Sequence, residues 1–127
     1  MDRAGVDRWL KGYLKAWKSD APEDIAALFS EDASYSPHPF SSHVWQGRNE
    51  IVQQWIERGD SGASWDFRSE IVAVEGDAAV IEGWTTYHAT AADPETMFAN
   101  VWLVRFAPDG RAREFSEWWV ERPRQSD

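Results

Sequence analysis

The hydrophobic pattern of this 127-residue chain changes its period once, at Trp65. Before that residue, apolar side chains recur every three or four positions, which is typical of amphipathic helices; after it they alternate, which is typical of half-buried strands. Helices followed by antiparallel strands predict an α+β fold, with the helices packed on one face of a curved sheet. A sheet of long strands that wraps round a helix forms a cone, and a ligand would enter at its open end.

Three helices are expected before Trp65. The first covers about residues 6–19 and has one aromatic face. Asp20 and Glu23, on either side of Pro22, predict the capping box of a second, short helix. The apolar face of that second helix would consist of Ile25, Leu28 and Phe29.

A short irregular extended segment and a third helix follow. Two prolines within residues 34–40 make that segment irregular. Gly47 precedes the third helix and Gly59 supplies its C-terminal stop.

Four strands are expected after Trp65. Turn signals at 75–77 and 108–110 pair the first strand with the second and the third with the fourth as antiparallel hairpins. The strand candidates are Trp65–Val74, Ala79–Ala89, Phe98–Phe106 and Ala112–Glu121.

Composition excludes several classes of partner. The formal net charge of -9 argues against nucleic acid and against an anionic membrane, since both require a basic patch. The chain has no cysteine, no apolar signal segment and no stretch long enough to span a membrane, so a cytoplasmic protein is expected. One domain is expected over residues 1–127, with a core at about 6–121 and a polar tail at 122–127. Nine tryptophans would fill a core or line a small-molecule pocket.

One carboxylate, Glu117, lies within an aromatic run near the C-terminus. Because side chains alternate along a strand, Glu117 shares a face with Phe115 and Trp119. A carboxylate among rings loses hydration, which disfavours its charged form and can produce an acid or base of useful strength. The alternative is a strand edge where Glu117 leans into water or pairs with an arginine.

The charged residues of the last hairpin indicate the register in which its two strands pair. A two-residue loop places Arg105 opposite Glu114, whereas a three-residue loop places two arginines together. The two-residue loop also sets Trp102 opposite Glu117. A four-residue loop gives the same faces with Asn100 opposite Glu117, so in both registers Asn100 can donate to the carboxylate or hold a water beside it.

The two faces of the sheet differ in character. The face with Asn100 and Glu117 is aromatic with isolated polar groups, which is typical of an apolar pocket. Gly83 on the same face would make room for a ligand or for an opposing helix. The other face exposes apolar area that a monomer rarely leaves open, which predicts a homodimer through Trp84, Trp118 and Val120.

Four local features resemble the SnoaL-like branch of the nuclear transport factor 2-like superfamily. They are residues 27–35 at the end of the helical pair, 45–51 leading into the third helix, the Gly76-Asp77 hairpin and the closing segment 108–118. The resemblance extends over about residues 6–121. It implies a cystatin-like α+β barrel, that is, a cone-shaped curved antiparallel sheet wrapped round N-terminal helices.

The resemblance says less about activity, because this fold hosts isomerases, cyclases, epoxide hydrolases, dehydratases and binding modules. Family enzymes place a catalytic carboxylate on the last strand, where Glu117 stands. The Arg-x-Asp pair of limonene epoxide hydrolase-like members falls on Gly83-Trp84-Thr85 and is missing. The His/Asp pair of SnoaL-type cyclases is not reproduced either, since no histidine lies on the last two strands. Tyr13 is a counterpart of the oxyanion-donating tyrosine of ketosteroid isomerase-like members.

The candidate catalytic residues are Glu117 as acid or base, Asn100 as an orienting donor, and His38, which lies between two prolines and could shuttle protons near neutral pH. No metal-site spacing, phosphate loop, dinucleotide fingerprint or nucleophile elbow is present, so neither a metal nor a cofactor is expected. Further residues are expected to contact a small hydrophobic ligand: Tyr13, Trp17, Tyr35, Phe40, Trp55, Phe67, Thr85, Tyr87, Trp102, Phe115 and Trp119.

Two functions fit these features. In the first, the protein is a cofactor-free isomerase, cyclase or hydrolase that uses Glu117 on a small hydrophobic substrate. In the second, it is a non-catalytic binding or dimerisation module whose cone is filled by its own tryptophans. An open cavity beside Glu117 would favour the first, and a closed core the second.

Overall fold

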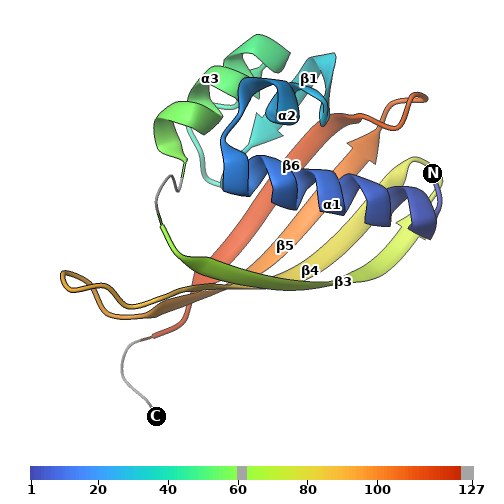
Figure 1. Cartoon of the computed structure of the whole chain (residues 1–127). Coiled ribbons are helices and arrows are strands. Elements are labelled where there is room, and N and C mark those ends of the chain that lie inside the picture. Colours follow the sequence, from blue (N-terminus) through green and yellow to red (C-terminus); the bar gives the residue numbers. More distant parts are fainter. Residues whose placement is uncertain (60–62, 124–127) are drawn as a thin grey trace.

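The computed structural model describes residues 1–59 and 63–123. Its helices are α1 (Arg3–Ser19), α2 (Pro22–Ala26) and α3 (Arg48–Arg58). Its strands are β1 (Phe29–Ser36), β2 (Trp45–Gln46), β3 (Trp65–Glu75), β4 (Ala78–Tyr87), β5 (Thr96–Phe106) and β6 (Ala112–Glu121). The helices all lie on one side of a strongly bent sheet, and α1 runs across its concave face (Figure 1).

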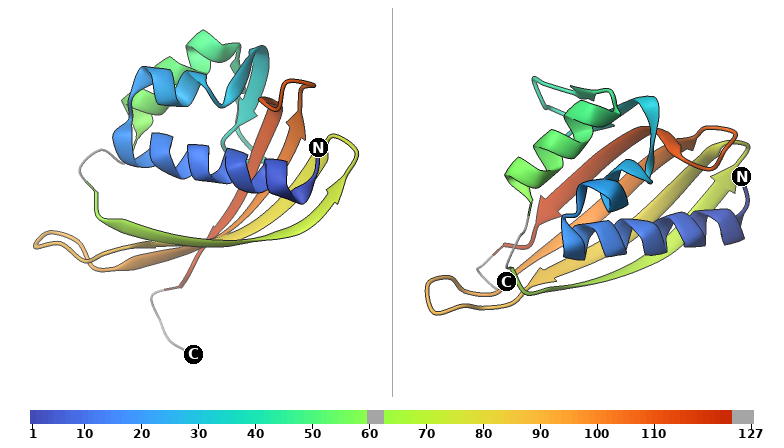
Figure 2. Two further views of the ribbon diagram at one scale, coloured as in Figure 1. Left: turned by 45° about the vertical axis from the view of Figure 1, so that its right-hand side comes forward. Right: turned by 45° about the horizontal axis from the view of Figure 1, so that its top comes forward.

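The sheet has the strand order β2-β1-β6-β5-β4-β3 and is not closed. Figure 2 shows how far β3–β6 curve beneath α1 while α2, α3 and β1 cover one side. This is the predicted α+β cone. One pair departs from the antiparallel expectation, because β1 runs parallel to β6. None of the helices in the described ranges is long and apolar enough to cross a membrane.

The register of the last hairpin is the one that charge predicts. Arg105 pairs with Glu114, and Trp102 pairs with Glu117. The register shifts after Arg105, so a bulge precedes the turn, and Gly110 takes a φ of 89° there. Inward side chains of β5 are buried and outward ones exposed in strict alternation from Ala99 to Phe106. The faces predicted for β5 and β6 are therefore confirmed.

The capping box predicted at Asp20 is wrong. Asp20 ends α1 in the left-handed conformation (φ 50°), and its N–H donates to the Ala16 carbonyl at 2.8 Å. Helix α2 follows Ala21 without a side-chain cap. An aspartate tolerates the left-handed region better than most residues, so the same side chain that can start a helix here finishes one.

Phe29 belongs to a strand rather than to the second helix. Helix α2 stops at Ala26, and Phe29 opens β1, which continues to Ser36 and thus begins before the predicted extended segment. Its side chain is fully buried because β1 packs against β6, where Phe29 pairs with Ala112. A distant strand therefore overrides the local helical spacing.

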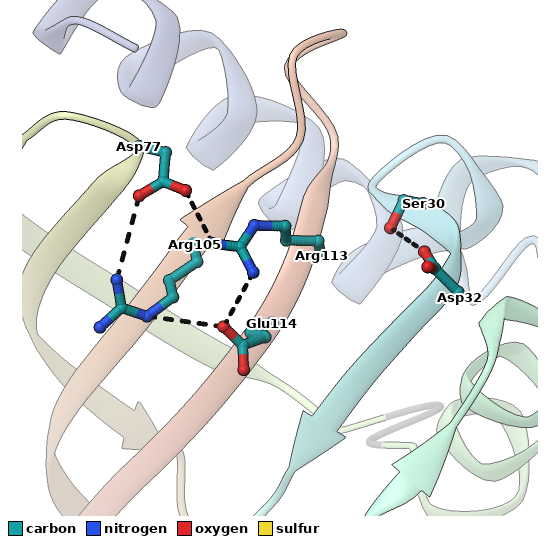
Figure 3. Close-up of polar contacts among 6 residues, drawn as sticks. All are labelled: Ser30, Asp32, Asp77, Arg105, Arg113 and Glu114. Atoms are coloured by element: carbon teal, nitrogen blue, oxygen red, sulfur yellow. Dashed lines mark hydrogen bonds and ion pairs between the residues drawn. The ribbon is translucent and has the colours of Figure 1, made fainter.

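Four charged side chains tie the β3–β4 turn to two strands, β5 and β6 (Figure 3). Arg105 Nε lies 3.5 Å from Glu114 Oε2, and Arg113 Nη2 donates to Asp77 Oδ2 at 2.7 Å. This hydrogen bond holds the pKa of the Asp77 carboxyl below its usual range. The network joins the β3–β4 turn to β5 and β6 at the end of the sheet where β5 leads into β6.

Candidate functional site

A cavity of about 490 Å³ opens on the concave face of the sheet. Its walls come from α1, α3 and every strand except β3, so side chains far apart in sequence meet there. That volume lies within the range of small-molecule sites, about 300–1,000 Å³. The lining residues are Tyr13, Trp17, Tyr35, Pro37, Trp45, Trp55, Arg58, Gly59, Thr85, Tyr87, Phe98, Asn100, Trp102, Glu117, Trp119 and Glu121.

Glu117 is half-buried in this wall and is held by two N–H donors. Asn100 Nδ2 donates to Glu117 Oε2 at 2.8 Å, and Trp102 Nε1 donates to the same oxygen at 3.1 Å. The predicted contact between Asn100 and Glu117 is thus present. Donors of this kind stabilise the ionised carboxylate and so oppose the loss of charge expected from the surrounding rings.

A buried hydroxyl fixes the orientation of Asn100. Thr85 is 2% exposed, and its Oγ1 donates to Asn100 Oδ1 at 2.8 Å. Because the carbonyl oxygen of Asn100 accepts from Thr85, its amide NH₂ is directed to Glu117. Thr85, Asn100 and Glu117 therefore form a chain across three strands, with one defined direction of donation.

Two tyrosines contribute hydroxyls to the same cavity. The hydroxyls of Tyr13 on α1 and Tyr35 on β1 are 3.1 Å apart. Burial, followed by the nearby Tyr35 and Glu117, raises the pKa of Tyr13 well above its usual value. Tyr13 consequently stays neutral in ordinary conditions and can donate a hydrogen bond, but it cannot act as a base.

Most of the predicted site residues lie at the cavity. His38, Phe40, Phe67 and Phe115 do not line it. Those that do are Glu117, Asn100, Tyr13, Trp17, Tyr35, Trp55, Thr85, Tyr87, Trp102 and Trp119.

The predicted site residues that do not line the cavity lie in the core or on the loop before β2. Phe115 is 1% exposed and stacks on Tyr35 at 4.5 Å, so it is part of the core. Phe40 is 89% exposed on the loop before β2. His38 Nδ1 accepts from the Phe40 N–H at 3.1 Å, and its ring lies 5.0 Å from Trp119, behind the cavity wall.

Phe67 occupies the space that Gly83 leaves. It stacks on Trp102 with ring centroids 5.0 Å apart. A Cβ on Gly83 would lie 2.5 Å from Phe67 Cζ, so the missing side chain accommodates this ring rather than a ligand or a helix. The prediction that Gly83 makes room for a ligand or a helix is therefore wrong.

Five lining side chains were not among the predicted site residues: Pro37, Trp45, Arg58, Phe98 and Glu121. Phe98 and Glu121 pair across β5 and β6, so the register of the last hairpin would have found them. Trp45 stacks on Tyr35 at 4.6 Å from a strand of only two residues, for which the sequence carries no periodic signal.

A second hollow of about 1020 Å³ lies between the N-terminal part of α1 and the β5–β6 turn. It is larger, but the charges around it pair with one another: Lys15 Nζ is 3.5 Å from Asp24 Oδ1, and Arg113 bonds Asp77. Among its lining residues in the described ranges, only Trp9 and Phe106 are aromatic, so the aromatic cavity is the better candidate. Within residues 1–59 and 63–123, no three His, Cys, Asp or Glu side chains gather as a metal site would require.

Solved structures share this fold at low sequence identity. The LEH-like epoxide hydrolase of M. tuberculosis is 14% identical with a TM-score of 0.70, over 92% of this chain and 84% of that chain. The epoxide hydrolase/cyclase-like enzyme SalBIII, from pyran ring formation in the polyether salinomycin, is 13% identical with a TM-score of 0.71, over 94% and 93%. A hypothetical protein of Catenulispora acidiphila with a ketosteroid isomerase-like fold, in complex with trimethylamine, is 20% identical with a TM-score of 0.66, over 87% of this chain and 83% of that chain.

No curated protein gives a significant match. The family described as the SnoaL-like domain matches residues 10–115, which is most of the chain. With the fold and this match together, the chain belongs to the family of SnoaL-like domains.

Proposed function

We propose that this protein binds a small, mostly apolar molecule in the aromatic cavity and that Glu117 acts on it as a general base. The observation that carries the proposal is the Glu117 carboxylate, oriented by Asn100 and Trp102 in the wall of a cavity of about 490 Å³. General acid–base catalysis requires such a group within hydrogen-bond reach of the substrate.

The same cavity supplies a matching donor. Glu117 would take a proton from carbon or from a hydroxyl, and the neutral Tyr13 would donate to the oxygen where negative charge develops. Isomerisation, cyclisation and hydrolysis all use such a pair. The epoxide hydrolase and SalBIII among the structural neighbours support chemistry of this class on small organic molecules, and the trimethylamine complex adds amines to the compounds to test.

A binding module without catalysis is the second candidate. Many of the rings pack on one another rather than on open space: Trp102 lies 4.4 Å from Tyr13 and 5.4 Å from Phe115 between ring centroids. Such a wall can hold a ligand without transforming it. The cavity argues against a wholly self-filled cone and leaves binding in place under both candidates.

Glu117→Gln separates the two candidates. The amide has the same shape but cannot accept a proton, so we expect the variant to fold and to lose turnover by about 10²–10⁴-fold. A thermal-shift screen of small ketones, epoxides and amines on the wild type finds binders, and product analysis of each binder measures turnover. Glu82→Gln, on the outer face of β4, is the matched control.

If the wild type and Glu117→Gln both bind a compound but turn it over equally or not at all, the protein is a binding module. If no compound in the screen stabilises either form, the binding proposal is wrong.

We also propose that two copies pack through the outer face of the sheet. Trp118 and Val120 on β6 are 52% and 68% exposed, and Val101 and Leu103 continue the apolar surface on β5. Arg68 lies 4.3 Å above the ring of Trp84 at one side of this surface. We expect the wild type to sediment as a dimer and Trp118→Glu as a monomer, since a buried unpaired carboxylate would be costly. A monomeric wild type at micromolar concentration would contradict this.

A further inference from the structure

We propose that the cavity selects an organic cation whose ammonium nitrogen carries alkyl groups and is attached to an apolar body. This inference rests on the proposed function only in that the cavity must bind a small molecule. It adds the chemical class of that molecule, and it holds equally for an enzyme and for a binding module.

Aromatic residues make up most of the lining of the cavity. Ring faces carry negative electrostatic potential and attract a cation placed within about 6 Å of the ring centroid, Trp most strongly. Five of the nine tryptophans of the chain line the cavity, and each comes from a different element. The lining rings are Tyr13, Trp17, Tyr35, Trp45, Trp55, Tyr87, Phe98, Trp102 and Trp119.

The charges in the wall have the sign that complements a cation. Glu117 and Glu121 contribute carboxylates, and Arg58 is the one guanidinium among the lining residues of the described chain. Arg58 is exposed, and its Nε donates to Gln54 Oε1 at 3.1 Å on its own helix. Glu117 by contrast is half-buried and is stabilised as an anion by Asn100 and Trp102. The inner part of the cavity therefore favours positive charge.

Alkyl groups on the nitrogen follow from the predominance of aromatic rings over carboxylates in the wall. A primary ammonium has three N–H donors and loses strong hydration when it enters a site, so it needs several oxygen acceptors. Nine of the lining residues are aromatic, whereas Glu117 and Glu121 supply the carboxylates, and Glu117 Oε2 already accepts from Asn100 and Trp102. An alkylated ammonium is weakly hydrated, needs few or no acceptors and contacts rings through its alkyl groups. A volume of about 490 Å³ also leaves space for an apolar body beyond the headgroup.

The test compares choline with 3,3-dimethylbutan-1-ol, which has the same shape with carbon in place of the charged nitrogen. Isothermal titration at constant ionic strength measures both affinities for the full chain. We expect the wild type to prefer choline by about tenfold, since several ring contacts and a carboxylate act on the charge. Glu117→Gln should reduce that preference severalfold and leave the alcohol unaffected.

Two further variants sharpen the comparison. Trp119→Leu keeps an apolar wall at a side chain that is 40% exposed and removes its ring, so choline should lose affinity while the alcohol keeps it. Glu82→Gln removes the same charge as Glu117→Gln from the outer face of β4 and should change neither affinity. The Glu82 control distinguishes the attraction of choline to the Glu117 carboxylate from the effect of the net charge of the protein.

Each outcome decides the matter. Equal or tighter binding of the alcohol by the wild type overturns the cation proposal and leaves cavity binding intact. A choline preference that Glu117→Gln and Trp119→Leu both leave unchanged overturns the assignment to this cavity. Absence of binding by both probes at tens of millimolar overturns this inference, while the wider screen under the proposed function still decides whether other compounds bind.

Discussion

Replacing Trp102 by alanine should lower the free energy of unfolding by about 3–5 kcal/mol, the range found for deletion of large buried aromatic side chains. Trp102 is 1% exposed on the concave face of β5. Its ring lies 4.4 Å from Tyr13 and 5.0 Å from Phe67 between centroids, the latter pair stacked at 12°. Alanine would leave a void between α1 and the sheet that these rings cannot fill without moving. Urea denaturation followed by circular dichroism measures the loss.

Trp102→Phe separates packing from hydrogen bonding at the same position. Phenylalanine keeps a ring in the core but removes the Nε1 donor that bonds Glu117 Oε2 at 3.1 Å. We expect a clearly smaller loss of stability than for alanine, together with weaker orientation of Glu117. Trp118→Ala is the matched exposed control, measured at a protein concentration where the chain is monomeric, and should cost about 0.5 kcal/mol or less. A loss below about 1 kcal/mol for Trp102→Ala would contradict its place at the centre of the core.

The sheet could be predicted from sequence where the relevant interactions are local or electrostatic. Alternation of side chains along β5 places Asn100 and Trp102 on one face of the sheet and Val101 on the other. In the β5–β6 hairpin, the register with a three-residue loop would have placed two arginines opposite each other. The facing of Glu117 and its bond to Asn100 follow from these two facts. Charge patterning in a hairpin is thus strong enough to position two of the cavity's polar groups.

Prediction failed where a distant part of the chain decides the conformation. Phe29 has helical spacing, but its partner is Ala112 in the parallel neighbour β6, and no local signal identifies a parallel strand. Asp20 has the chemistry of both a helix start and a helix end, and the geometry of the α1–α2 junction selects the end. Trp45 reaches the cavity from a two-residue strand. These contacts required the assembled fold.

The bond from Thr85 to Asn100 depends on a pairing of β4 with β5 that no tight turn fixes. In that pairing Gly83 lies directly opposite Asn100, so the Thr85 hydroxyl reaches Asn100 diagonally. Residues 88–95 join the two strands without a two-residue hairpin loop. The sequence therefore identified Thr85, Asn100 and Glu117 as site residues. It could not predict that Thr85 donates to Asn100 and Asn100 to Glu117.

Thr85→Val should disturb Glu117 without touching it. Valine has nearly the shape of threonine but no hydroxyl, so Asn100 Oδ1 would lose its donor in a side chain that is 6% exposed. A buried polar atom left without its partner costs about 1–3 kcal/mol, and we expect that loss of stability in urea denaturation. With its carbonyl released, the Asn100 amide can rotate and leave Glu117 with one fewer fixed donor. The preference for choline over 3,3-dimethylbutan-1-ol should then fall, although every carboxylate is still present.

Thr85→Ser and Thr86→Val distinguish this positioning role from simple packing. Serine retains the hydroxyl and loses a methyl group, so it should restore the orientation of Asn100 and the choline preference while still costing packing energy. Thr86 lies on the opposite face of β4, opposite Met97, and its change to valine should alter neither stability nor preference appreciably. If Thr85→Ser impaired the choline preference as much as Thr85→Val, the methyl group rather than the hydroxyl would matter. The Thr85 hydroxyl would then have no part in holding Glu117, to which Asn100 and Trp102 would donate without its support.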